Sequence, residues 1–81
     1  MITPNPFTNE FTVHFNSEKE MIVIGELITL RSKVIHTQKL NIVPGENIFR
    51  IAPPQDIESG VFVFRILEEN TLLGFAKAIK K

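Results

Sequence analysis

Short segments of branched and aromatic residues, broken by turn residues at intervals of roughly 8–12 positions, run through this whole sequence. Val, Ile, Thr and Phe make up 30 of its 81 residues, whereas Ala and Leu make up only nine. Branched and aromatic side chains fit a pleated sheet and lose rotamer freedom in a helix. No segment repeats apolar residues at helical spacing for long enough to indicate a helix. The sequence therefore predicts an all-β domain.

Six or seven short strands are expected, and their spacing is typical of an antiparallel sandwich or barrel. Phe11, Val13 and Phe15 alternate with polar residues, so one face of the first strand is apolar. Gly25 interrupts a segment that is apolar on both faces, which indicates a bulge or a close backbone approach. The expected strands cover residues 11–15, 21–30, 33–40 or 33–43, 47–52, 61–67 and 72–79.

A chain of 81 residues without an internal linker predicts one domain that spans residues 1–81. Its core has to form without disulfides, because the sequence contains no cysteine. Aromatic residues on the apolar faces of the expected strands are predicted to supply much of it. They are Phe11, Phe15, Phe49, Phe62, Phe64 and Phe75.

Composition excludes several classes of protein. Nine basic and nine acidic residues give a net charge of zero, which argues against nucleic acid as a partner. No unbroken apolar run exceeds four residues, so no transmembrane segment is expected. The lack of cysteine excludes thiolate chemistry, and the first residues do not have the pattern of a signal peptide.

The sequence offers little material for catalysis, so we predict no enzyme, no catalytic residue, no metal site and no cofactor. A metal site would need both histidines, His14 and His36, together with a carboxylate. The serines at positions 17, 32 and 59 lie in expected turns, outside any nucleophile motif. Phosphate-binding glycine motifs are missing, and without Trp or Tyr a stacking platform for sugars is disfavoured, so no small-molecule substrate is expected.

The two ends of the sequence remain. The segment 4–7 holds two prolines around Asn5, with Phe7 able to pin the chain to the edge of the core. From the residues alone, an ordinary rigid domain boundary explains this segment better than a function does. The segment 75–81 is a strand that runs into two lysines. The lysines either protect a strand edge from pairing or mark a terminal strand that another protein binds, by adding a strand of its own.

Taken in order, these motifs strongly resemble the type A C-terminal sorting domain of the type IX (Por) secretion system of Bacteroidetes, over essentially the whole chain. Three departures are visible: Thr3 stands in place of a common Tyr, Ser32 in place of a turn glycine, and Phe62 in place of Tyr. The matching residues are Pro4, Asn5, Pro6 and Phe7 (P-N-P-F), Gly45 and Asn47 (G-x-N), Ser59, Gly60 and Phe62 (S-G-x-Y), and Lys80 and Lys81 (the basic end).

The resemblance implies an immunoglobulin-like β-sandwich of about seven strands that performs no chemistry and serves as a sorting signal for a larger cargo protein. The cargo would pass through the periplasm and then reach the outer membrane, the cell surface or the medium. The expected partners are the type IX machinery and a sortase-like surface peptidase that cuts upstream of Pro4. Residues 1–3 would then be a residual linker or an artificial start.

Within this resemblance, Gly60, Phe62 and the strand that ends at Lys80 and Lys81 are the predicted recognition region. Gly45 and Gly60 have an alternative explanation, an effect on backbone shape alone. The alternative function is an immunoglobulin-like spacer or adhesion module that binds glycan or protein and has no effect on export. An autonomous enzyme is the remaining alternative.

Overall fold

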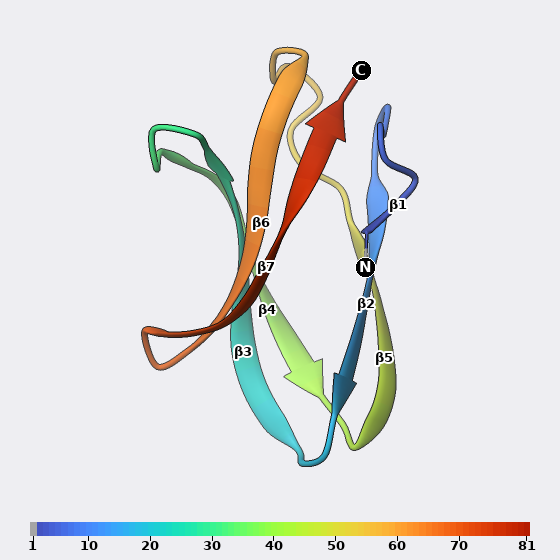
Figure 1. Cartoon of the computed structure of the whole chain (residues 1–81), viewed down its shortest axis with the longest axis vertical. Helices are drawn as coiled ribbons and strands as arrows, with labels where there is room; N and C mark the ends of the chain where they lie inside the picture. Colours follow the sequence, from blue (N-terminus) through green and yellow to red (C-terminus); the bar gives the residue numbers. More distant parts are fainter. Residues whose placement is uncertain (1) are drawn as a thin grey trace.

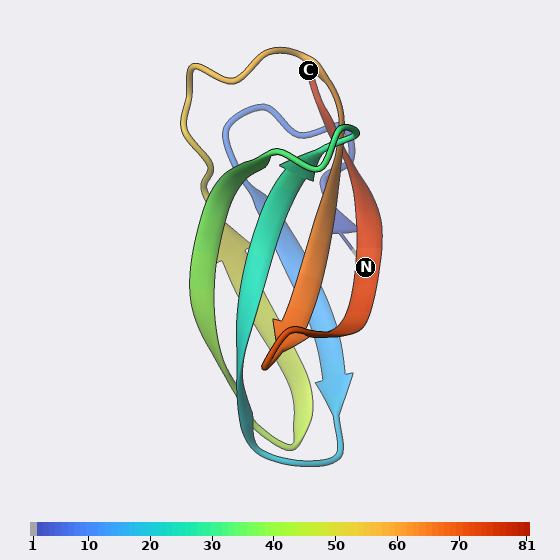
Figure 2. The same ribbon diagram turned by 90° about the vertical axis from the view of Figure 1, so that its left-hand side faces the viewer.

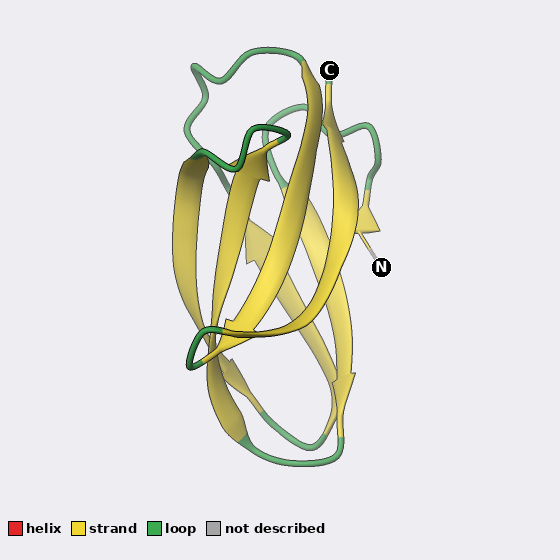
Figure 3. Cartoon of the chain, turned by 60° about the vertical axis from the view of Figure 1, so that its left-hand side comes forward, coloured by secondary structure: helices red, strands yellow, loops and turns green. Residues whose placement is uncertain are grey.

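The computed structural model describes residues 2–81, which form seven strands and no helix (Figures 1 and 3). Within these residues, no helix has the length and apolar character that crossing a bilayer requires. The strands are β1 (Ile2–Thr3), β2 (Phe11–Ser17), β3 (Met21–Thr29), β4 (Val34–Ile42), β5 (Gly45–Ile51), β6 (Gly60–Glu68) and β7 (Thr71–Lys80).

The strands form two antiparallel sheets that pack face to face. One sheet has the order β1-β2-β5 and the other β4-β3-β6-β7, and in Figure 2 the four-stranded sheet lies in front. This is the arrangement of an immunoglobulin-like sandwich in which the fourth strand pairs with the third, as the added strand of variable-type domains does, and not with the fifth. The predicted all-β, antiparallel, immunoglobulin-like sandwich is confirmed, and the six expected strands agree with β2 to β7 to within a few residues at each end. The short strand β1 was missed.

Alternation along the strands builds the core between the sheets. In β2, Phe11 and Val13 point inward and are buried, and Phe15 is partly buried against the same cluster. The aromatic centre joins β2, β6 and the segment before β2: the ring centroids of Phe7 and Phe11 are 4.8 Å apart, and those of Phe11 and Phe64 are 5.6 Å apart. Offset and edge-on ring contacts of this kind are favourable.

Phe75 is not a core residue, and this part of the core prediction was wrong. Its side chain is 71% exposed. Side chains alternate along β7, so Ala76 and Ala78 point inward and Ala78 is fully buried. The ring of Phe75, between Gly74 and Ala76 in the sequence, therefore points to solvent. Of the other five phenylalanines in the predicted core, Phe11, Phe62 and Phe64 are buried, and Phe15 and Phe49 are partly buried against the core.

Two small residues show how closely the backbone is constrained. A Cβ atom at Gly25 would lie 2.6 Å from Cζ of Phe64, so the predicted close approach is confirmed. The register shift of β3 lies elsewhere, between Leu27 and Ile28. Ser32 lies in the turn before β4 with a φ of 68°, a conformation that favours glycine. Glycine is the residue that the family resembled by this sequence usually has at this turn.

Candidate recognition surface

The segment Asn5–Phe7 lies along the free edge of β7 and forms a clamp with residues 77–81. Phe7 donates its N–H to the carbonyl of Ile79 at 2.7 Å, and its own carbonyl accepts the N–H of Lys81 at 2.9 Å. This pairing is a parallel bridge between Phe7 and Lys80. We call this unit, Asn5–Phe7 with Lys77–Lys81, the terminal clamp.

The side chain of Asn5 extends the clamp by one further step. Its Oδ1 accepts the N–H of Ile79 at 2.8 Å, and its Nδ2 donates to the carbonyl of Lys77 at 3.0 Å. The amide group therefore takes the place of a peptide unit of a neighbouring strand, since it offers one acceptor and one donor to alternate backbone groups of β7. The two flanking prolines cannot donate from their backbone nitrogens, so the side chain supplies what the backbone there cannot.

Phe7 anchors the clamp in the core. Its side chain is fully buried and packs against Phe11. The peptide bonds Thr3-Pro4 and Asn5-Pro6 are cis, and Pro4, Asn5 and Pro6 are themselves exposed. The P-N-P-F segment thus presents its prolines to solvent and holds the last strand through Asn5 and Phe7.

The S-G-x-F residues lie beside the clamp. Gly60 begins β6 and pairs with Lys80, and Phe62 pairs with Ala78. Gly60 has a φ of 145°, a backbone conformation that residues with a Cβ atom rarely adopt. Ser59 is exposed, whereas the Phe62 side chain is 6% exposed and lies in the core. A partner that binds the folded domain would therefore contact the backbone around Gly60 and the lysines more readily than the Phe62 ring.

Three of the four motifs meet at one end of the sandwich, which we call the terminal end: it holds the terminal clamp and the start of β6. In Figure 1 this end lies at the top, where the C-terminus is marked. Lys77, Lys80 and Lys81 lie within the last five residues, and two of them, Lys77 and Lys81, are exposed. Asn5 is 72 and 74 residues away in sequence from its two partners on β7, Lys77 and Ile79.

The G-x-N motif lies at the opposite end, which we call the turn end because the β2–β3 and β4–β5 turns meet there (Figure 1). Gly45 has a φ of 97° and pairs with Ser17. The side chain of Asn47 is 5% exposed; its Oδ1 accepts the N–H of Val43, and its Nδ2 lies within 3.2 Å of the carbonyls of Val43, Gly45 and Phe15. These contacts indicate that the side chain of Asn47 fixes the conformation of the turn between β4 and β5.

The outer face of the four-stranded sheet is a second exposed surface. Glu26 and Arg65 form an ion pair of 2.7 Å between neighbouring strands, and Arg65 pairs with Phe75 across the next strand. Around them lies a group of exposed apolar side chains on β3, β6 and β7: Ile22, Ile24, Val61, Leu72 and Phe75.

The described residues bring together no set of three side chains suited to holding a metal ion. His14 lies on β2 and His36 on β4, in different sheets, and Nε2 of His36 is 3.3 Å from Oε1 of Gln38. The partners of Asn5 on β7 were not predicted from the sequence. An asparagine between two prolines was the available signal, because the neighbouring backbone cannot donate there.

Comparison with known protein families supplies a match over the whole chain. A family model described as a secretion system C-terminal sorting domain matches residues 1–81. No curated protein and no solved structure matches the chain.

Proposed function

The chain belongs to the secretion system C-terminal sorting domains, the signals that direct a larger protein into type IX secretion, and we propose that the terminal end is the part that the secretion machinery binds. A sorting signal of this kind sends the attached cargo to the cell surface or out of the cell. The predicted function agrees with this family, and no finding favours the alternative of a spacer or adhesion module.

The observation that carries the proposal is the convergence of three motifs on the terminal end. The terminal clamp joins residues 5–7 to residues 77–81, and Gly60 at the start of β6 pairs with Lys80 in it. A partner that binds this surface would distinguish the folded domain from an unfolded chain, because only folding joins residues 5–7 to residues 77–81. Lysine side chains there suit an acidic surface on the partner.

The remaining steps are part of the same proposal. The cargo first crosses into the periplasm and is carried from there through the outer membrane. A sortase-like peptidase at the surface then cuts upstream of Pro4, and residues 1–81 act as one unit that is not itself an enzyme. Anchoring of Phe7 in the core supports a cut upstream of Pro4, because the chain from Phe7 onward is held in the folded unit.

An export assay tests the proposal. A reporter with an N-terminal signal for the inner membrane carries these 81 residues at its C-terminus in a bacterium with a working type IX system. The intact fusion is expected at the cell surface, whereas a fusion that stops at Gly74 is expected to remain in the periplasm.

A second variant separates binding from folding, because the shortened chain also loses the buried Ala78. A fusion that stops after Ile79 retains Ala78 and both hydrogen bonds of Asn5. It is expected to remain folded, as circular dichroism would show, and to lose most of its export. Full export of this variant would remove the last two lysines from the proposed binding surface.

A further inference from the structure

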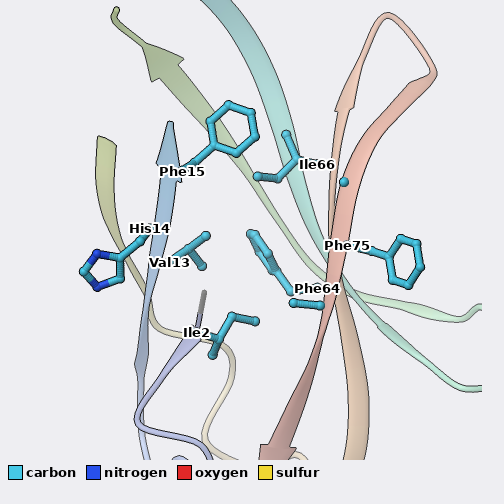
Figure 4. A pocket seen from close by; sticks show the side chains of 9 residues that line it. Ile2, Val13, His14, Phe15, Phe64, Ile66 and Phe75 are labelled. Atoms are coloured by element: carbon cyan, nitrogen blue, oxygen red, sulfur yellow. The ribbon is translucent and has the colours of Figure 1, made fainter. Parts of the chain in front are cut away.

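The outer face of the four-stranded sheet is apolar, although antiparallel sheets commonly turn a polar face to water. Ile24 and Phe75 on this face are 39% and 71% exposed. Ile28 is buried but lies outside the core cluster, because it follows the inward-pointing Leu27 along β3. Figure 4 shows Phe64 of β6 beside the pocket between the sheets, whereas Phe75 points away from it. An apolar face of this kind on a small domain indicates a surface that another molecule covers.

The centre of this face carries the ion pair of Glu26 and Arg65, whose Oε1 and Nε atoms are 2.7 Å apart. These two residues are the middle of a row that begins with Thr37 on β4 and ends with Phe75 on β7. In a second copy packed face to face, a two-fold axis parallel to the strands and between β3 and β6 would reverse this row. Glu26 would then lie over Arg65 of the second copy, and Thr37 over its Phe75. The charged centre is therefore complementary to itself, as an interface between two identical surfaces requires.

The rows on either side of the ion pair have apolar residues on both central strands. Ile24 of β3 pairs with Leu67 of β6, and Ile28 pairs with Val63. The same axis would place Ile24 over Leu67 of the second copy and Ile28 over its Val63. Facing apolar side chains leave water together, which is the main favourable term in most protein association.

The lysines of this face lie at the ends of the rows, away from the axis. Lys39 on β4 and Leu72 on β7 end one row, and Val34 and Lys77 end the other. Reversal of the rows would put each exposed lysine over an apolar residue of the second copy, not over the same lysine. A lysine can lay its methylene groups along apolar surface and leave its ammonium group in water. In the flanking rows, this arrangement sets no like charges directly opposite each other.

We propose that two copies of the domain pair through this face, with the strands of the two sheets nearly aligned, as is common between packed sheets. Four strands about 4.8 Å apart and three rows about 7 Å apart define a contact of roughly 20 by 20 Å. Two such faces bury on the order of 1,000 Å² in total, near the lower limit for a specific interface. The dimer is therefore weak, with a Kd on the order of 10–100 µM, and dilute solutions contain mainly the monomer.

Because the axis runs parallel to the strands, both copies would have their terminal ends on the same side of the dimer. One partner with two binding sites could then hold both copies at once, which raises its apparent affinity. Only this consequence rests on the proposed function, since the pairing itself needs no cargo and no machinery.

Sedimentation equilibrium of the 81-residue chain measures the association directly. Between about 1 µM and 1 mM, the average mass is expected to rise from 9.2 kDa, the mass of one chain, toward twice that value. A mass of one chain at every concentration would overturn the proposal and leave the face to a different partner, such as the cargo or the secretion machinery. Because no export step is involved, that result would not touch the sorting function.

Charge reversal at the ion pair tests the face and its symmetry. Glu26→Arg and Arg65→Glu each set like charges opposite one another in a dimer of identical chains, so each variant alone should associate at least about tenfold more weakly. An equimolar mixture of the two variants should associate at least about tenfold more tightly than either alone, because arginine then faces glutamate at both positions. A mixture as weak as its components, or a dimer that neither variant weakens, would overturn the proposed pairing.

A matched pair of isoleucines tests the face with the ion pair left intact, should the charge variants fail to fold. Ile24 lies on this face, whereas Ile48 lies on β5 in the other sheet and is 57% exposed. Ile24→Asp should weaken the association at least about tenfold, because the carboxylate loses water on pairing, and Ile48→Asp should change it less than about twofold. Equal effects of the two substitutions would place the contact elsewhere and contradict the proposal.

Discussion

Asparagine side chains replace backbone groups at both ends of this sandwich, with different reach. Asn47 is buried, and three of the four backbone atoms that its side chain bonds belong to residues within four positions in sequence. Asn5 is exposed, and both its partners lie more than 70 residues away on β7. The first fixes a local turn; the second joins the two ends of the sequence.

The difference suggests a division of labour. Loss of the buried amide leaves polar groups without partners inside the protein, which costs stability everywhere. Loss of the exposed amide lets water replace its bonds, so the cost is small and confined to the end of β7. The amide of Asn47 is thus expected to act mainly on the stability of the fold, and the amide of Asn5 mainly on how the end of β7 is presented to a partner.

The largest expected effect concerns the anchor of the terminal clamp. Phe7→Ala removes a fully buried ring and should lower the free energy of unfolding by about 4 kcal/mol. Urea denaturation of the purified domain measures it. Phe75→Ala is the matched control, because that ring is 71% exposed, and should change stability by less than about 1 kcal/mol. Similar losses for the two variants would mean that Phe7 does not anchor the clamp.

Asn47→Ala should lower the free energy of unfolding by about 3 kcal/mol, because it removes a buried amide that bonds the N–H of Val43 and neighbouring carbonyls. Thermal unfolding should show a midpoint lower by roughly 15 °C. Asn41→Ala, an exposed position on β4, serves as the control and should leave the midpoint nearly unchanged. If Asn47→Ala and Asn41→Ala have the same unfolding midpoint, the amide of Asn47 does not contribute the stability assigned to it.

Gly45 and Gly60 both have a positive φ and lie at opposite ends of the sandwich, so the same substitution can be compared at the two ends. No atom stands within 4 Å of a Cβ built at Gly45 or Gly60, so the cost of Gly45→Ala and Gly60→Ala comes from the backbone alone. Each should lower stability by about 2 kcal/mol. Chemical denaturation of the two variants side by side would show it, and a neutral effect at either site would argue against the observed conformation there.

The smallest expected effect on stability comes from Asn5→Ala, at about 1 kcal/mol, because its hydrogen bonds lie at the surface. Its local effect should be large. Amide exchange at Ile79, measured by NMR, should quicken by more than about tenfold while the amides of β3 remain protected. Uniform acceleration across the molecule would instead mean that Asn5 supports the whole fold.

The sequence allowed the strands to be predicted because alternation is a local signal, as at Phe11, Val13 and Phe15. Phe75 was misplaced by the assumption that the largest apolar residue of a strand faces the core, whereas β7 turns small residues inward. The motif residues were identified, but their convergence was not, because no local pattern reveals a contact between residues 5 and 79. The two residues of β1 were too few to show any periodicity.

Charge reversal of lysines at the terminal end and away from it decides whether the machinery binds the terminal end. Export of the reporter fusion is compared between Lys80→Glu with Lys81→Glu at the terminal clamp and Lys19→Glu with Lys39→Glu, both exposed and away from it. If the terminal end is the bound surface, the first pair reduces the fraction of reporter at the cell surface at least about tenfold, and the second leaves it within about twofold of the unaltered fusion. Equal export by the two variants, with both folded, would mean that the machinery binds elsewhere.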